Sequence, residues 1–357
     1  MVLFLRTIKV VTKMVEVLEF GSAKAVPGKK GTGYIKVGEL CDGSPVNMPV
    51  IILNGKNPGP KLLIYALEDG DEYPGSLGAL EACNDILPKH LDQMNGSVVF
   101  LPATNISAFR GNQFGGGQRN SPLDIDQGAR LPSLYPGNPY GRHTDQLAYQ
   151  IQKVKDTYDP DVQIRYHGCK QIFGWDRILY RKSPLGSKLD NLARAAVTKP
   201  GGMCLLTYER GEPKERPLEI SVETNGGDDG VGNGFNGDAM RDALLNVMRH
   251  LKIIPGEEIK VEKMQYVSYK RIQMPDGILS TSGINTKRGG FFKVLVNIKD
   301  DVKKDQVVGQ VKNFFGEVVE EIKSPIDGVV IGYFCEAPHI GSGQWRAFEI
   351  AEKTEYR

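Results

Sequence analysis

Residues 61–75 have the sequence KLLIYALEDGDEYPG, in which an apolar run stops abruptly at four acids, Glu68, Asp69, Asp71 and Glu72. The pattern predicts a buried strand that delivers carboxylates to its C-terminal end, where open α/β sheets bind their ligands. Crowded carboxylates repel one another unless a cation or an arginine neutralises them, so a metal ion is the first ligand to look for. A solvated acidic turn between a strand and a helix is the alternative.

Predicted strands and a predicted helix flank this stretch. Residues 33–40 (GYIKVGEL), 48–53 (MPVIIL) and 98–102 (VVFLP) are short β-type runs, most of them next to turn residues. Apolar residues recur near helical spacing in residues 76–91, SLGALEACNDILPKHL, which places the acids between a strand and a helix. The N-terminus of that helix would also stabilise negative charge.

A second predicted strand, residues 161–167 (DVQIRYH), ends in His167. Two strands that both end in metal-type ligands, Asp69 with Glu72 and then His167, support a metal site more strongly than either strand alone. Taken singly, His167 is more typical of a hydrogen-bonded structural histidine.

Further candidate residues follow in the chain. Residues 103–140 form a long Gly-rich and polar segment without clear secondary structure, which is usually functional, so Arg110, Arg119 and Arg130 are candidates for substrate contact. Any single one of them is more often a surface residue. Residues 143–154 and 235–254 have the apolar spacing of amphipathic helices.

The composition is that of an ordinary globular chain. Its 357 residues suggest about two domains, and 45 basic against 43 acidic residues give a net charge of +2, which indicates neither a nucleic-acid partner nor a membrane surface. Five cysteines without CxxC spacing argue against a disulfide framework or a zinc ribbon. No apolar stretch is long enough to span a bilayer, so we expect a soluble, cytoplasmic protein. Residues 1–13 are expected to be a disordered extension or to precede a true start at Met14.

The order of motifs resembles the succinylglutamate desuccinylase and aspartoacylase family, a branch of the zinc carboxypeptidase clan. The motifs are MPVIILNGKNPGP, DGDEYPG, LPATNxxA, RNSPLDxDxxxR, YPG, the strand ending in His167, and SVETNG. Each motif is weak alone, whereas their combined order, which covers roughly residue 31 to the C-terminus, is specific.

The resemblance implies roles for individual residues. Glu72 and His167 match two ligands of the family's single zinc ion, and Asp69 occupies the position of the third, usually a histidine. Arg119 matches the arginine that stabilises the oxyanion, and Arg130 with Asp124 matches the loop that grips the substrate. Glu223 ends the predicted strand LEISVE and matches the general base; without the resemblance, an exposed glutamate at a strand end would be an equal alternative.

Three positions depart from the family pattern. Asp69 replaces the first histidine ligand, Arg165 stands where an aspartate usually precedes the second histidine, and Ala129 replaces the asparagine beside Arg130. Aspartate oxygen is an accepted zinc ligand, but a site with two carboxylates is harder and less discriminating among divalent metals.

The resemblance also implies the architecture. We expect a mixed-sheet, zinc-carboxypeptidase-like α/β domain over residues 14–255 and a smaller β-rich, barrel-sandwich-like domain over residues 256–357. The segment DDVKKDQVVGQV followed by SPIDGVVIGY resembles half of a biotinyl or lipoyl carrier domain, without a lysine in the exposed hairpin that would carry a prosthetic group.

Two functions of different classes follow from these expectations. The first is a metal-dependent amidohydrolase, a deacylase with one Zn²⁺ or another divalent ion per chain, that cleaves the amide bond of a small N-acyl amino-acid-like substrate. The second is a catalytically inactive relative that binds a small anionic ligand. Either protein would take a small-molecule ligand, with no nucleic acid or membrane as partner, and a homo-oligomer is compatible with both. Retention of Glu223 favours the enzyme, because an inactive site has little need of a base.

Overall fold

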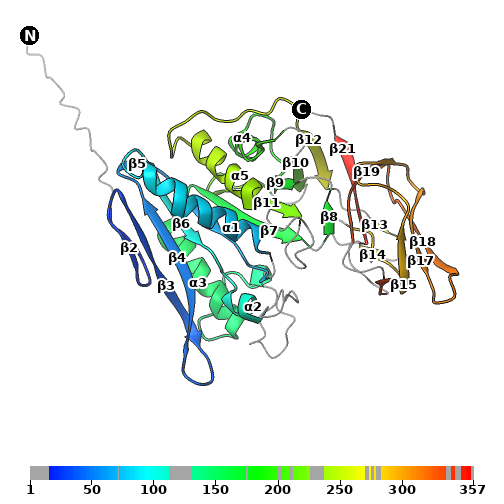
Figure 1. Cartoon of the computed structure of the whole chain (residues 1–357), viewed down its shortest axis with the longest axis horizontal. Coiled ribbons are helices and arrows are strands. Elements are labelled where there is room, and N and C mark those ends of the chain that lie inside the picture. Colours follow the sequence, from blue (N-terminus) through cyan, green and yellow to red (C-terminus); the bar gives the residue numbers. More distant parts are fainter. Residues whose placement is uncertain are drawn as a thin grey trace, which may run out of the picture.

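The computed structural model describes residues 16–70, 72–111, 131–169, 171–173, 176–199, 203–208, 212–225, 237–269, 273–274, 277–278, 283–334, 339–341 and 347–354. Within these residues, one large sheet runs through the molecule (Figure 1) in the order β16-β19-β21-β12-β10-β9-β11-β7-β5-β6-β4-β3, with β8 paired to β19. Its strands are β3 (Lys29–Glu39), β4 (Pro45–Asn54), β5 (Asn57–Tyr65), β6 (Asn95–Leu101), β7 (Val162–Cys169), β8 (Gln171–Phe173), β9 (Asp176–Arg181), β10 (Met203–Tyr208), β11 (Leu218–Asn225), β12 (Gln265–Tyr269), β16 (Asp301–Val302), β19 (Gly328–Phe334) and β21 (Phe348–Thr354).

The remaining elements are helices and smaller sheets. The helices are α1 (Pro74–Glu81), the π-helix η1 (Ala82–Ile86), the 3₁₀-helices η2 (Leu87–His90) and η3 (Leu131–Ser133), α2 (Ile106–Gly111), α3 (His143–Tyr158), α4 (Lys188–Ala195) and α5 (Gly237–His250). Smaller sheets contain β1 (Leu18–Phe20) with β2 (Ala23–Ala25), β13 (Gln273–Met274) with β14 (Gly277–Ile278), and β18 (Val318–Lys323), β17 (Val307–Lys312), β15 (Gly290–Val294) and β20 (His339–Ile340).

The large sheet is mixed, as the sequence predicts. Strands β6, β5, β7 and β11 run parallel to one another, whereas β4 and β9 pair antiparallel to β6 and β11. Because parallel strands end at the same edge, the segments that follow β5, β7 and β11 meet there. The expected α/β class is therefore confirmed.

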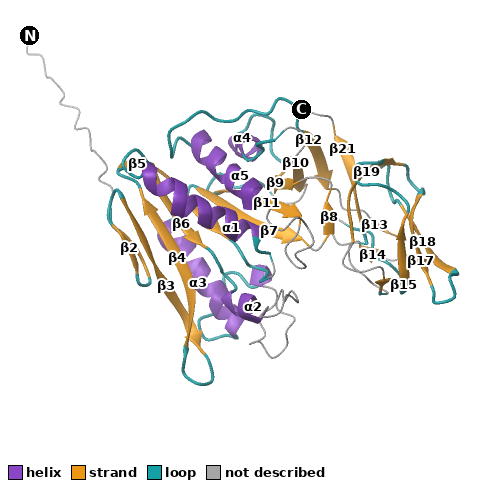
Figure 2. Cartoon of the chain, in the orientation of Figure 1, coloured by secondary structure: helices purple, strands orange, loops and turns teal. Residues whose placement is uncertain are grey.

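Helices cover both faces of the central strands (Figure 2), which explains the unbroken apolar run of β5. Leu62 and Ile64 pack in a core cluster with residues of α1, α4 and α5. Leu63 and Tyr65, which point to the opposite face, pack in a second cluster with residues of α3. Successive side chains of a strand point to opposite faces of the sheet, so β5 contributes residues to both hydrophobic clusters.

The predicted helix at residues 76–91 is broken into three pieces. It begins at Pro74 in α1 and continues as η1 and η2. Pro88 lacks the backbone N–H that a continuing α-helix would need, and it lies in the first turn of η2, where that donor is not missed. The predicted helix at 143–154 is confirmed and extends to Tyr158; Asp159, with φ of 49°, ends it in the left-handed conformation.

The C-terminal region has its own core, centred on Val308, Val311, Ile322 and Phe348. β12 follows residue 256 but pairs in parallel with β10, so this strand extends the large sheet. The division into two domains at residues 255 and 256 stays a prediction. Of the helices in the described ranges, none combines the length and the apolar character that crossing a membrane requires.

Candidate metal centre

The acidic segment after β5 is held by specific local contacts. Leu67 has φ of 55°, which turns the chain at the end of the strand. The Asn105 side-chain amide then donates to the backbone carbonyl of Glu68 at 3.1 Å. Gly70 packs closely on α2, because a Cβ at this position would lie 2.5 Å from the backbone carbon of Ala108. These contacts fix the direction in which the following side chains point.

The three predicted metal ligands converge. Asp69, Glu72 and His167 each offer a ligand atom, and these atoms all lie within 4.8 Å of one another. Asp69 and Glu72 are 1% and 3% exposed, and His167 Nδ1 lies 2.9 Å from Glu72 Oε2. Two carboxylates and an imidazole are ligand types that zinc and related divalent ions accept. The donor set therefore fits a divalent metal.

The electrostatics of His167 agree with such a site. Burial acts to lower the pKa of His167, but the charge of Glu72 and its hydrogen bond outweigh burial, and the pKa is raised above the usual value. The carboxylates therefore favour a positive charge at this position. A metal ion would supply that charge in place of the imidazole proton.

Glu68 takes a different role from its neighbours. The Arg165 guanidinium donates to Glu68 Oε2 from Nε at 3.0 Å and from Nη2 at 2.7 Å, and the Tyr135 hydroxyl donates to Oε1 at 2.7 Å. Burial would raise the pKa of Glu68, but the charges of Arg165 and His167 and the Tyr135 hydrogen bond lower it to about 2. Glu68 is thus an ionised carboxylate whose charge is balanced by the Arg165 guanidinium. Its Oε2 lies 3.6 Å from His167 Nε2.

Glu223 reaches the same edge of the sheet from the next strand. In the parallel pairing of β11 with β7, Glu223 lies directly beside His167, so both side chains point to one face. Glu223 Oε2 accepts hydrogen bonds from Arg177 Nε at 3.1 Å and Nη2 at 2.8 Å. Arg177 is the cross-strand partner of Glu223 on β9.

Arg177 also binds a second carboxylate, that of Glu349 on β21. Arg177 Nη1 donates to Glu349 Oε2 at 2.7 Å, and the two residues are 2% and 0% exposed. Sequence analysis identified Glu223 but missed its partners in this triad, Arg177 and Glu349. The sequence feature that could have revealed these two residues is a charge within an apolar run: Arg177 lies in DRILY and Glu349 lies in FEIA.

The other predicted site residues fall between positions 110 and 130 of the sequence. Arg119, Asp124 and Arg130 are outside the described residues, as is Ala129. Arg110 is described and lies exposed on α2. The roles of Arg119, Asp124 and Arg130 therefore stay predictions.

No family model matches the chain, and no curated protein matches it in sequence. Solved structures match it over most of its length. A succinylglutamate desuccinylase from a Silicibacter species has a TM-score of 0.72 at 20% identity and covers 93% of this chain and 98% of its own. An aspartoacylase family protein from Mesorhizobium loti has a TM-score of 0.69 at 18% identity, covering 96% and 99%. The ectoine utilization protein of Ruegeria pomeroyi has a TM-score of 0.71 at 19% identity, covering 91% and 95%. The fold of this chain is thus the one shared by structures named for the aspartoacylase and succinylglutamate desuccinylase family.

Proposed function

We propose that the protein is a metal-dependent amidohydrolase that removes the acyl group from a small N-acyl amino-acid-like substrate. The observation that carries this proposal is the convergence of Asp69, Glu72 and His167 at one sheet edge with Glu223 on the adjacent strand. The names of the structural neighbours, a desuccinylase and an aspartoacylase family protein, support the same reaction class.

The residues have distinct tasks in this proposal. Asp69, Glu72 and His167 would hold one divalent ion, with Zn²⁺ as the first candidate, and the ion would activate water and polarise the amide carbonyl. Glu223 would accept a proton from the attacking water and deliver it to the leaving amine. Arg177 fixes the Glu223 carboxylate in one orientation through two hydrogen bonds.

Further parts of the proposal rest on the sequence resemblance. Arg119 would stabilise the oxyanion, and Arg130 with Asp124 would bind the substrate. The β-rich region after residue 256 would form a second, barrel-sandwich-like domain beside the site. We further propose a cytoplasmic protein that takes a small-molecule substrate and associates, if at all, as a homo-oligomer.

One observation favours the second candidate, an inactive relative that binds a small anion. Glu223 Oε2 forms an ion pair with Arg177 Nη2 at 2.8 Å, so this carboxylate already has a cationic partner within the protein, as a structural glutamate would have. Comparing the metal content and the hydrolytic activity of the purified protein separates the two candidates.

The test begins with elemental analysis of protein purified without chelator, for which we expect about one divalent ion per chain. Release of the free amino acid from a panel of N-acyl amino acids is then followed for the parent and two variants. Glu223→Gln should lower kcat by roughly a hundredfold or more, because an amide cannot accept the proton. Glu262→Gln, a change at an exposed residue, is the matched control and should leave kcat unaltered. A protein that takes up no zinc, manganese or cobalt, or a Glu223→Gln variant as active as the parent, would refute the proposal.

A further inference from the structure

A hollow lies on the face of the sheet that α3 covers, with residues of α3 in its lining. It has a volume of about 540 Å³, and the residues that matter here are Tyr65, Tyr135, Lys155, Arg165, Lys214 and Glu219. Its floor includes Pro160 and Pro217, just before β7 and β11 begin, whereas His167 and Glu223 lie towards the carboxyl ends of these strands. Along β7, the hollow therefore extends from Pro160 as far as Arg165, and His167 lies beyond it.

Lys155 is the unusual group in this hollow. Its Nζ lies 4.1 Å from the centre of the Tyr135 ring and 4.5 Å from that of Tyr65, and it donates to the Tyr65 hydroxyl at 3.4 Å. Lys155 forms no salt bridge with any residue in the described part of the chain. Burial, reinforced by the charge of Arg165, lowers the pKa of Lys155 to about 8, against the opposing effect of Glu68. An ammonium group has three donors, so this half-buried cation has donors left for a ligand.

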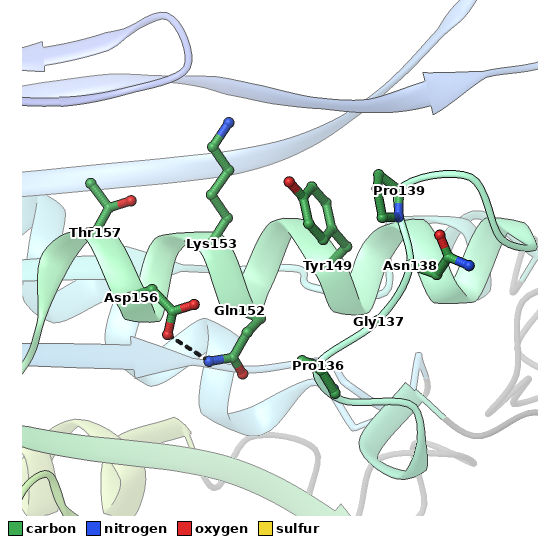
Figure 3. Close-up of a pocket in the computed structure, with 9 residues that line it drawn as sticks. All are labelled: Pro136, Gly137, Asn138, Pro139, Tyr149, Gln152, Lys153, Asp156 and Thr157. Atoms are coloured by element: carbon green, nitrogen blue, oxygen red, sulfur yellow. Dashed lines mark hydrogen bonds between the residues drawn. The ribbon is translucent and has the colours of Figure 1, made fainter.

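The acids of the hollow are already occupied. Asp159 accepts from Arg216 at 2.9 and 3.0 Å, and Asp156 Oδ1 accepts from the Gln152 amide at 2.7 Å (Figure 3). Glu219 Oε1 lies 3.6 Å from Arg165 Nη1. Lys214, at the exposed rim, forms no salt bridge with a described residue. Of the charged residues in the lining, Lys155, Lys214 and Asp156 have no salt bridge with a described residue, so the unbalanced charge is mainly positive and favours an anion.

We propose that this hollow binds a small carboxylate- or phosphate-bearing molecule, with Lys155 as its anchor, Lys214 at the rim and the rings of Tyr65 and Tyr135 as apolar walls. The site is distinct from the metal centre and does not depend on the hydrolytic function. It is nevertheless connected to that centre, because Arg165 lines the hollow and also donates two hydrogen bonds to Glu68 beside His167. An anion that attracts Arg165 would weaken its hold on Glu68.

The same helix supplies a matched control. Lys153 is exposed and lines a neighbouring hollow of about 420 Å³, on the other side of Gln152 and Asp156, which line both hollows. In Figure 3, its side chain points away from these two residues. Lys153 thus shares the helix and the charge of Lys155 but not its surroundings.

Site-resolved labelling tests the proposal on the full chain. Lysine amines are modified with a limiting amount of acetic anhydride, with and without inorganic phosphate or succinate, and the modification of each lysine is followed by mass spectrometry. At an anion concentration ten times its Kd, labelling of Lys155 should slow about tenfold. The reagent reacts only with protein molecules whose hollow holds no anion, and these are then about a tenth of the total. Labelling of Lys153 in the same samples should stay unaltered. The two probes separately report phosphate and carboxylate binding.

Calorimetric titration of the same two anions into variants gives the second measurement. Lys155→Met should weaken binding roughly tenfold or more, in keeping with the loss of one charge-assisted hydrogen bond, whereas Lys153→Met and the charge-conserving Lys155→Arg should bind nearly as the parent does. Thermal unfolding of each variant checks that it is folded. Failure of both anions to protect Lys155, or binding that persists in Lys155→Met and disappears in Glu72→Gln, would overturn the proposal; the latter result places the anion at the metal centre.

Discussion

Replacing Arg177 by methionine would remove the guanidinium shared by Glu349, which is fully buried, and Glu223, whose side chain is 15% exposed. The ion pairs measure 2.8 and 2.7 Å, and Arg177 is almost wholly enclosed, so little water can take the place of the lost donors. Removing one partner of a buried ion pair typically reduces the free energy of unfolding by about 3–5 kcal/mol. Since a domain is stable by only about 5–15 kcal/mol, Arg177→Met should lose a large share of the total.

Arg216 offers a closely matched control. It also binds two carboxylates, those of Asp159 and Asp161 at 2.9 and 2.8 Å, but its side chain is 47% exposed. Because solvent screens an exposed pair, Arg216→Met should reduce the free energy of unfolding by about 1 kcal/mol or less. Each arginine pairs with two carboxylates, and the two residues differ chiefly in burial.

Equilibrium unfolding in urea, with the m-value required to match the parent, measures both losses. The double variant Arg177→Met with Glu349→Gln should recover part of the loss, about 1–3 kcal/mol, because the charge of a fully buried carboxylate has been removed together with its guanidinium partner. Two results would refute this reasoning: equal losses for Arg177→Met and Arg216→Met, or a double variant less stable than Arg177→Met. Either result would show that the burial of the carboxylate charge does not determine the loss of unfolding free energy.

Three further predictions concern the metal centre. Asp69→Ala should lose metal affinity and activity together, and Asp69→His should shift metal preference towards zinc and move the best rate to lower pH; metal titrations and pH–rate profiles of the three proteins decide this. Glu68 has a pKa of about 2 against an ordinary 4.5, so it should contribute on the order of 3 kcal/mol above pH 4.5 that is lost as the pH falls towards 2; Glu68→Gln should flatten acid denaturation curves over that window. Metal affinity should fall as the pH drops through the raised pKa of His167, because proton and metal compete for the imidazole; isothermal titration at several pH values measures the proton released.

The sequence predicts the convergence of the three candidate metal ligands because their positions depend on strand ends. The apolar run at residues 62–67 overlaps β5, which ends at Tyr65, and the predicted strand at 161–167 overlaps β7, which begins at Val162; β5 and β7 run parallel and adjacent. Once two such strands are neighbours, the side chains that follow them meet at one edge, so Asp69, Glu72 and His167 converge without any further information.

The buried arginines could not be predicted in this way. Arg177 and Glu349 are 172 positions apart, and Arg165 and Glu68 are 97 apart. Local periodicity shows that a charge interrupts an apolar strand, but it does not show which of the many opposite charges in the chain neutralises it. The four acids after β5 are equally ambiguous in sequence, and only the register of Tyr65 with Arg165 explains why Glu68 forms the ion pair.

Two of the departures from the family pattern, Asp69 and Arg165, change the charge of the site in opposite directions. Asp69 in place of a histidine brings one more negative group to a segment that already carries Glu68 and Glu72, all three of them buried. Arg165 in place of an aspartate brings a positive group to the same site, and its guanidinium donates to Glu68, which is not one of the three candidate metal ligands. Had Arg165 been the usual aspartate, its carboxylate would face Glu68 in a low-dielectric environment, where like charges are strongly unfavourable. The two substitutions therefore offset each other, and they preserve a metal-type ligand set with an altered balance of charge around it.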